Sequence, residues 1–148
     1  MVFCKCLFIS NIKSIAAKKI SSINSEIPLP KMGKTEVIKW KSKDGLEIEG
    51  ILTYPVGYKK GEKVPLVLQI HGGPAGVFSK NFTGNPSIYM TQYFAQEGVA
   101  VLRPNPRGSS GYGKEFRYAN FKDWGYGDYE DVMSGVDKVI DMGVADES

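Results

Sequence analysis

The feature that most constrains this chain is an apolar run that ends abruptly in a glycine turn. Residues 64–70 read VPLVLQI, and His71, Gly72, Gly73 and Pro74 follow directly. A short continuous apolar run predicts a strand buried on both faces, as in a parallel sheet. Adjacent glycines permit backbone angles closed to other residues and let a ligand approach the bare amides. Open α/β sheets bind ligands at the carboxyl ends of their strands, so this turn is a candidate site, with a simple tight turn as the alternative.

Patterns on either side of this turn predict a domain that mixes strands and helices. Asp44-Gly45 is a strong hairpin signal, and Asn85-Pro86 is typical of a helix start. Strands that alternate with helices indicate a mainly parallel sheet with crossover helices, so the predicted fold class is α/β. The expected elements are strands over 35–41, 46–54, 64–70 and 99–102, and helices over 85–98 and 128–142.

The clearest helix covers residues 128–142, because its apolar residues recur at helical spacing. Three acids, Asp128, Glu130 and Asp131, lie near its start, where the helix dipole favours negative charge. That position explains the three acids without a catalytic role. Glu130 and Asp131 are predicted to lie on the polar face of the helix. The predicted buried stripe consists of Tyr129, Val132, Met133, Val136, Val139 and Ile140.

The first 30 residues differ from the rest and are predicted to be a tail and linker. Residues 14–23 are expected to form a helix or a frayed tail, and Pro28 and Pro30 mark a linker. The folded domain is therefore placed at residues 31–148. Lys5 interrupts the early apolar patch, so no signal peptide is predicted; the compartment is left open, with the cytoplasm as the default.

Composition argues against several classes of partner and cofactor. A net charge of +3, without a basic run interleaved with aromatics, argues against nucleic acid as a partner. No apolar stretch is long enough to span a bilayer, so a membrane is not an expected partner either. The chain has two cysteines, Cys4 and Cys6, and one histidine, which argues against a zinc site. The glycines of residues 107–113 are spaced G-x-x-G-x-G, which argues against a dinucleotide site. No metal or cofactor is expected.

Acyl transfer needs a nucleophile, a base and donors for the oxyanion, and only the donors have candidates here. In α/β-hydrolases an HGGG-type loop after the third strand supplies one oxyanion N–H, and residues 71–74 are a close variant. No G-x-S-x-G motif occurs, and neither serine of residues 108–111 has that spacing. His71 precedes any candidate nucleophile, whereas the triad of these enzymes ends in histidine. We therefore interpret His71 as a residue that shapes the turn.

Four strings together resemble the first half of the catalytic domain of prolyl oligopeptidase family serine peptidases, above all the dipeptidyl-peptidase and acylaminoacyl-peptidase branches. They are KSKDGLEIEGILTYP (41–55), PLVLQIHGGPAG (65–76), PNPRGSSGYGKEF (104–116) and WGYGDYEDV (124–132). Residues 20–40 resemble the family's link from its β-propeller into the hydrolase domain. The resemblance implies a partial α/β-hydrolase fold, with an antiparallel hairpin followed by parallel strands, truncated before the nucleophile elbow.

The resemblance also implies a function and a site. It implies a serine-type peptidase that cleaves peptide or acyl-aminoacyl bonds, with a peptide as the partner of the full-length enzyme. The oxyanion N–H falls on Gly73, beside Gly72, and the nucleophile, acid and base are expected after Ser148, so the chain alone is expected to be inactive. An esterase- or lipase-like hydrolase fragment and a non-catalytic interaction module are the alternatives. An unpaired edge on the strand over 64–70 is expected to make the isolated chain self-associate.

Overall fold

The computed structural model describes residues 8–11, 14–22, 25–26, 28, 30–73, 75–84 and 87–147, which belong to two units. The first unit ends at Lys31 and contains β1 (Phe8–Asn11) and β2 (Ser14–Lys19). These strands pair antiparallel. The helix or frayed tail expected from residue 14 is therefore wrong over β2, because pairing with β1 satisfies the backbone of this segment as a sheet.

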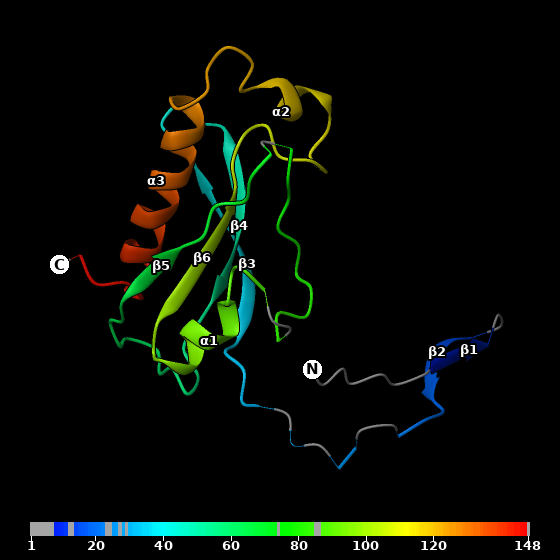
Figure 1. Cartoon of the computed structure of the whole chain (residues 1–148). Helices are drawn as coiled ribbons and strands as arrows, with labels where there is room; N and C mark the ends of the chain where they lie inside the picture. Colours follow the sequence, from blue (N-terminus) through cyan, green and yellow to red (C-terminus); the bar gives the residue numbers. More distant parts are fainter. Residues whose placement is uncertain are drawn as a thin grey trace. The chain divides into compact units, whose positions relative to one another are not determined.

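The second unit, Met32–Ser148, is built on a four-stranded sheet with the order β3-β4-β6-β5 (Figure 1). Its strands are β3 (Thr35–Lys41), β4 (Glu47–Thr53), β5 (Leu66–Leu68) and β6 (Ala100–Asn105). β3 and β4 form the hairpin predicted around Asp44-Gly45. β6 pairs antiparallel with β4 and parallel with β5. The described sheet is therefore mixed, with two antiparallel pairings and one parallel pairing, so the prediction of a mainly parallel sheet is wrong for these strands. The predicted hairpin and the predicted parallel pair are both confirmed.

Within the described residues, three helices accompany this sheet: α1 (Thr91–Gln96), α2 (Lys114–Tyr118) and α3 (Gly127–Asp141). α3 packs against β3, β4 and β6, and α1 packs against β4 and β6 (Figure 1). Successive side chains of β6 point to opposite faces of the sheet. Leu102 joins Val139 of α3 in the main core, whereas Arg103 lies against Phe78 on the other face. The strand is therefore buried on both sides.

The indole of Trp40 determines how closely α3 approaches the hairpin. Its Nε1 donates a hydrogen bond of 2.9 Å to the carbonyl oxygen of Asp131 in α3. A Cβ atom added to Gly50 of β4 would lie 2.7 Å from the indole, and one added to Gly135 of α3 would lie 2.6 Å from it. Both positions therefore need glycine, since a methyl group would push the ring away.

β5 is shorter and less buried than predicted. The strand covers Leu66–Leu68, which is half-buried, rather than all of residues 64–70. Val64 makes a single parallel bridge with Ala145, and Ile70 is 54% exposed. Apart from that bridge, β5 pairs along one side only within the described residues. Its outer edge therefore lacks the neighbour that would bury it completely.

α1 begins later than predicted. Its first residue is Thr91, after Met90 in a left-handed conformation; Asn85 and Pro86, the predicted start, lie outside the described residues. Gln69, next to β5, accounts for the difference. Its side-chain oxygen accepts a hydrogen bond of 3.0 Å from the Thr91 hydroxyl, and its amide donates to the carbonyl oxygen of Tyr89. These contacts hold the preceding turn in a non-helical form.

The buried stripe predicted for α3 is partly wrong. Val132 and Val139 are buried as predicted, but Tyr129 is 57% exposed. Asp131, predicted on the polar face, is completely buried, because it forms an ion pair with the buried guanidinium of Arg107. No helix in the described segments is long and apolar enough to cross a membrane.

We predict that the isolated chain self-associates through the outer edge of β5 and that Val67→Lys prevents this, because a charge on an edge strand opposes pairing with a second chain. Size-exclusion chromatography with light scattering at tens of micromolar measures the mass. Val37→Lys is the matched control, since Val37 lies on β3, the opposite edge strand of the same sheet. A sharp monomer peak for the unmodified chain would contradict the prediction.

Candidate active site

The predicted turn lies just beyond the carboxyl end of β5. His71 is half-buried, whereas Gly72 and Gly73 are exposed. Gly73 has a φ of 82°, a conformation that favours glycine. Pro74 lies outside the described residues. Among the described residues, no backbone hydrogen bond uses the amide of Gly72 or Gly73.

A second loop, residues 107–113 after β6, holds this turn. Ser109 is completely buried, and its hydroxyl donates a hydrogen bond of 2.6 Å to the carbonyl oxygen of Pro106. Because that proton is engaged, Ser109 Oγ accepts the hydrogen bond of 3.1 Å from His71 Nε2. Ser110 bonds to backbone carbonyls just after the turn through its N–H and its hydroxyl. The two serines therefore tie one loop to the other.

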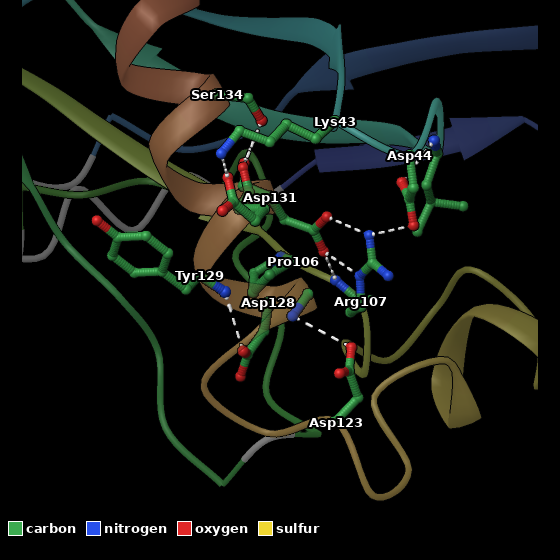
Figure 2. Close-up of polar contacts among 12 residues, drawn as sticks. Lys43, Asp44, Pro106, Arg107, Asp123, Asp128, Tyr129, Asp131 and Ser134 are labelled. Carbon is green, nitrogen blue, oxygen red and sulfur yellow. Dashed lines mark hydrogen bonds and ion pairs between the residues drawn. The ribbon is translucent and has the colours of Figure 1, made fainter.

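A buried ion pair anchors the start of that second loop. Asp131 of α3 accepts hydrogen bonds from Arg107 Nε at 2.9 Å, from Nη2 at 2.8 Å and from the backbone N–H at 2.8 Å (Figure 2). Bidentate pairing of this kind is geometrically specific and charge-assisted. The hydrogen bond to Asp131 is the main cause that raises the pKa of Arg107 above its ordinary value. α3 is thereby fixed to the loop that carries Ser109.

The same guanidinium reaches the turn between β3 and β4. Arg107 Nη2 lies 2.8 Å from Oδ2 of Asp44, whose other carboxylate oxygen accepts the N–H of Leu46 at 3.1 Å. The neighbouring Lys43 pairs with Glu130 of α3, with 2.7 Å between nitrogen and oxygen. Figure 2 shows these side chains converging from the hairpin, from the loop after β6 and from α3. Three segments far apart in the sequence therefore meet at Arg107.

Asn105 and Phe78 anchor the segment that follows the turn. Asn105 Oδ1 accepts the N–H of Phe78 at 2.7 Å, and Nδ2 donates to the Phe78 carbonyl oxygen at 2.9 Å. The ring of Phe78 meets those of His71 and Tyr89 edge-on, with centroid distances of 5.2 and 4.9 Å. His71 is therefore held by Ser109 through a hydrogen bond and by Phe78 through ring packing.

A cavity of about 490 Å³ lies beside the turn. Its wall includes His71 and Gly72 from the turn, Phe78 and Tyr89 from the following segment, and Arg103 from β6. A volume of this size suits a small ligand or a few side chains. No group of three or more metal-ligating His, Cys, Asp or Glu side chains exists within the described residues.

The electrostatics of His71 suit a structural role. Burial lowers its pKa, because the surroundings disfavour the charged imidazolium. Nε2 is already engaged as a donor to Ser109. A neutral ring with this nitrogen occupied is not available as a general base there. The hydrogen bond to Ser109 and the ring contact with Phe78 hold His71 directly before Gly72 and Gly73.

The sequence identified the turn but not the residues that hold it. Asp131 was assigned to the solvent-facing side of α3, and Ser109 was considered only as an unsuitable nucleophile. One signal was present in the sequence: Asp131 stands four residues before Gly135, and such residues share one helical face. A glycine on that face marks a close approach, here to Trp40, and so indicates that the acid next to it is also turned inward.

We predict that Asp131→Asn lowers the free energy of unfolding by about 3–5 kcal/mol, because it leaves the Arg107 guanidinium without its buried counter-charge. Asp44→Asn is the matched control, since the Asp44 side chain is 53% exposed. That change is expected to cost about 0–1 kcal/mol. Denaturant unfolding measures both values, and equal costs for the two variants would contradict the assignment of Asp131 as the main partner.

We predict that His71 titrates below 6.5, its ordinary pKa, in the folded chain. The unfolded state then binds the proton more readily, so His71 destabilises the fold as the pH falls through 6.5 toward the lowered value. The chain has one histidine, so a single imidazole Cε1–H resonance in proton NMR reports it directly. The chain unfolded in urea supplies the reference, and a folded pKa at or above that reference would contradict the prediction.

Comparison with known proteins gives this site its context. Residues 86–148 match the sequence model of the prolyl oligopeptidase family. An uncharacterized peptidase of Bacillus subtilis, YuxL, is 40% identical over 105 residues, which are 71% of this chain and 15% of that protein. The probable dipeptidyl-peptidase 5 of Emericella nidulans is 36% identical over 104 residues, which are 69% of this chain and 14% of that protein. The chain therefore spans about one seventh of the length of these curated relatives.

Solved structures agree with the sequence matches. The acylaminoacyl peptidase of Pyrococcus horikoshii superposes with a TM-score of 0.72 at 30% identity, over 88% of this chain and 20% of that one. A puromycin-hydrolyzing peptidase of Mycobacterium tuberculosis superposes with a TM-score of 0.71 at 27% identity, over 82% of this chain and 18% of that one. The chain matches part of α/β-hydrolase peptidase structures. It is a partial member of the prolyl oligopeptidase family of serine peptidases, related to dipeptidyl-peptidase 5 and to the acylaminoacyl peptidases.

Proposed function

We propose that this chain supplies the oxyanion-binding part of a serine peptidase active site that hydrolyses peptide or acyl-aminoacyl bonds. Gly73 donates its backbone N–H to the oxyanion, Gly72 lies beside it, and His71 shapes the turn. The observation that carries the proposal is the His71-Gly72-Gly73 turn beyond β5, whose two exposed amides have no backbone acceptor among the described residues. Membership of a serine peptidase family supports the choice of reaction.

The chemistry follows from charge development at the scissile carbonyl. Attack by a serine converts the carbonyl oxygen into an oxyanion, and fixed N–H donors stabilise that charge without reorganising. A turn held by Ser109 and Phe78 keeps such donors in place before the reaction begins. The φ of 82° at Gly73 permits this backbone path only with a residue that tolerates the left-handed region.

We propose that the nucleophile, the acid and the base come from sequence outside these 148 residues. His71 is the single histidine of the chain, and its Nε2 is engaged with Ser109. Ser109 is buried, and its hydroxyl proton goes to a carbonyl oxygen. In this proposal residues 1–30 are a tail and linker, residues 31–148 are the first half of a catalytic domain, and the chain alone has no peptidase activity.

A chimaera tests the role of the Gly73 amide. Residues 64–147 of this chain replace the matched segment of the Pyrococcus horikoshii acylaminoacyl peptidase, and Gly73→Pro then deletes the N–H. We predict a fall of about 100- to 1,000-fold in kcat, because one oxyanion donor is lost. Turnover of a chromogenic acyl-amino acid substrate provides the measurement.

Gly98→Pro in the same chimaera is the matched control. Gly98 has a φ of 81°, close to the 82° of Gly73, and an added Cβ would meet nothing within 4 Å at either position. The backbone strain is therefore comparable, while Gly98 follows α1 and lies outside the His71-Gly72-Gly73 turn. A similar kcat for both variants would remove the oxyanion role of Gly73.

A further inference from the structure

Arg103 is a charged side chain in the interior of this domain. It lies on β6, and its side chain points to the face opposite the main core, where Leu102 packs. Only 5% of the residue is exposed. Arginine is almost never buried to this extent unless it is paired.

Within the described residues, the Arg103 guanidinium has no carboxylate partner. Its Nε and Nη2 atoms are buried and have no hydrogen-bond acceptor there, and no ion pair joins it to a described acid. The guanidinium lies over the ring of Phe78, whose centroid is 5.2 Å from Cζ. Since Phe78 is fixed to Asn105 by two hydrogen bonds, the guanidinium rests on a rigid support.

Arg103 also lines the cavity beside the His71-Gly72-Gly73 turn. No acidic residue is among the described residues of its wall, so the positive charge is not compensated there. The rings of Phe78 and Tyr89 form part of the same wall and lower its polarity. The cavity therefore combines a buried cation with aromatic surface, next to the turn that carries the exposed amides.

The physics of this arrangement favours an oxyanion as the occupant. Burial lowers the pKa of Arg103, but a guanidinium remains charged in proteins. A buried charge without a counter-charge is unfavourable, and a bidentate oxyanion relieves it with two charge-assisted hydrogen bonds. A single guanidinium matches the single charge of a carboxylate. A phosphate carries about two charges and is usually met by several cations.

We propose that Arg103 is the binding residue of a carboxylate pocket beside the His71-Gly72-Gly73 turn. The carboxylate is an acidic side chain or the free C-terminus of a peptide. The choice of a peptide as its carrier rests on the proposed function, whereas the site itself rests on the burial of Arg103, on the cavity, and on the lack of an acceptor for Nε and Nη2 among the described residues. Arg103 is thus a specificity-determining residue and takes no part in bond cleavage.

Binding to the 148-residue chain tests this directly. The 15N–1H resonance of Arg103 Nε is followed by NMR during titration with three N-acetylated peptides: acetyl-Ala-Glu-Ala-amide, acetyl-Ala-Gln-Ala-amide and acetyl-Ala-Ala-Ala with a free C-terminus. A saturable shift with the glutamate peptide or with the free acid, and none with the glutamine peptide, supports the site. The stronger of the two identifies the source of the carboxylate. Equal binding of all three peptides, or stronger binding of inorganic phosphate, overturns the proposal.

Two variants separate binding from folding. Arg103→Met is expected to weaken binding of the better carboxylate peptide by about 10- to 100-fold, because a charged hydrogen-bond partner is lost. It is also expected to raise the melting temperature of the free chain, because the uncompensated buried charge is gone. Lys80→Gln is the matched control: it removes one positive charge from an exposed residue that is absent from the cavity wall. That variant should bind as the unmodified chain does.

Arg103→Lys is the second variant at this position. If Arg103→Met does not fold, Arg103→Lys keeps one charge without the bidentate fork and should bind more weakly than the unmodified chain. Unchanged affinity in either Arg103 variant overturns the proposal. Binding is measured without turnover, so an inactive chimaera with intact carboxylate binding would refute the proposed function and leave this site standing.

Discussion

The ion pair between Arg107 and Asp131 is the interaction on which the rest of this domain depends. It joins the loop after β6 to α3, and the same guanidinium reaches Asp44 in the hairpin turn. A buried carboxylate with three hydrogen bonds from one residue leaves little freedom in the relative position of these segments. Trp40 reinforces the junction, because its indole bonds to the backbone of Asp131 and fits between two glycines.

The ion pair is connected to the candidate active site through the residues that follow Arg107 in the chain. Ser109 follows Arg107 by two residues, and its hydroxyl carries the hydrogen bond to His71. His71 in turn precedes Gly72 and Gly73, whose amides are exposed. An electrostatic contact on one side of the sheet is therefore connected, residue by residue, to the backbone groups proposed to bind the oxyanion. Such preorganisation is what a site of this type requires.

Local patterns in the sequence were enough for much of the fold. Asp44-Gly45 predicted the hairpin, and periodic apolar residues predicted α3. Failures occurred where distant residues decide the outcome. Asp131 was placed on the solvent side because a carboxylate counts as polar until Arg107 is brought to it. β5 was predicted too long, since burial of its ends depends on neighbours that no local pattern reveals.

In the candidate site, too, local patterns predicted some features, and distant residues decided the others. The turn at His71, Gly72 and Gly73 was predicted from its glycines and its place after an apolar strand, and its role as an oxyanion site stays a prediction. Ser109, which bonds to His71, and Arg103, which we propose binds a carboxylate, were not predicted as site residues. Both act through contacts with residues more than 20 positions away in the sequence, so only the folded chain brings their partners together.

The most direct test of this account asks whether the buried ion pair controls the turn. Backbone 15N–1H spectra of Asp131→Asn are compared with those of Asp44→Asn and of the unmodified chain, under conditions in which all three are folded. We predict that the amides of Gly72 and Gly73 shift in Asp131→Asn together with the imidazole signal of His71, and that they stay in place in Asp44→Asn. Unchanged Gly72 and Gly73 amides in the folded Asp131→Asn variant would contradict it.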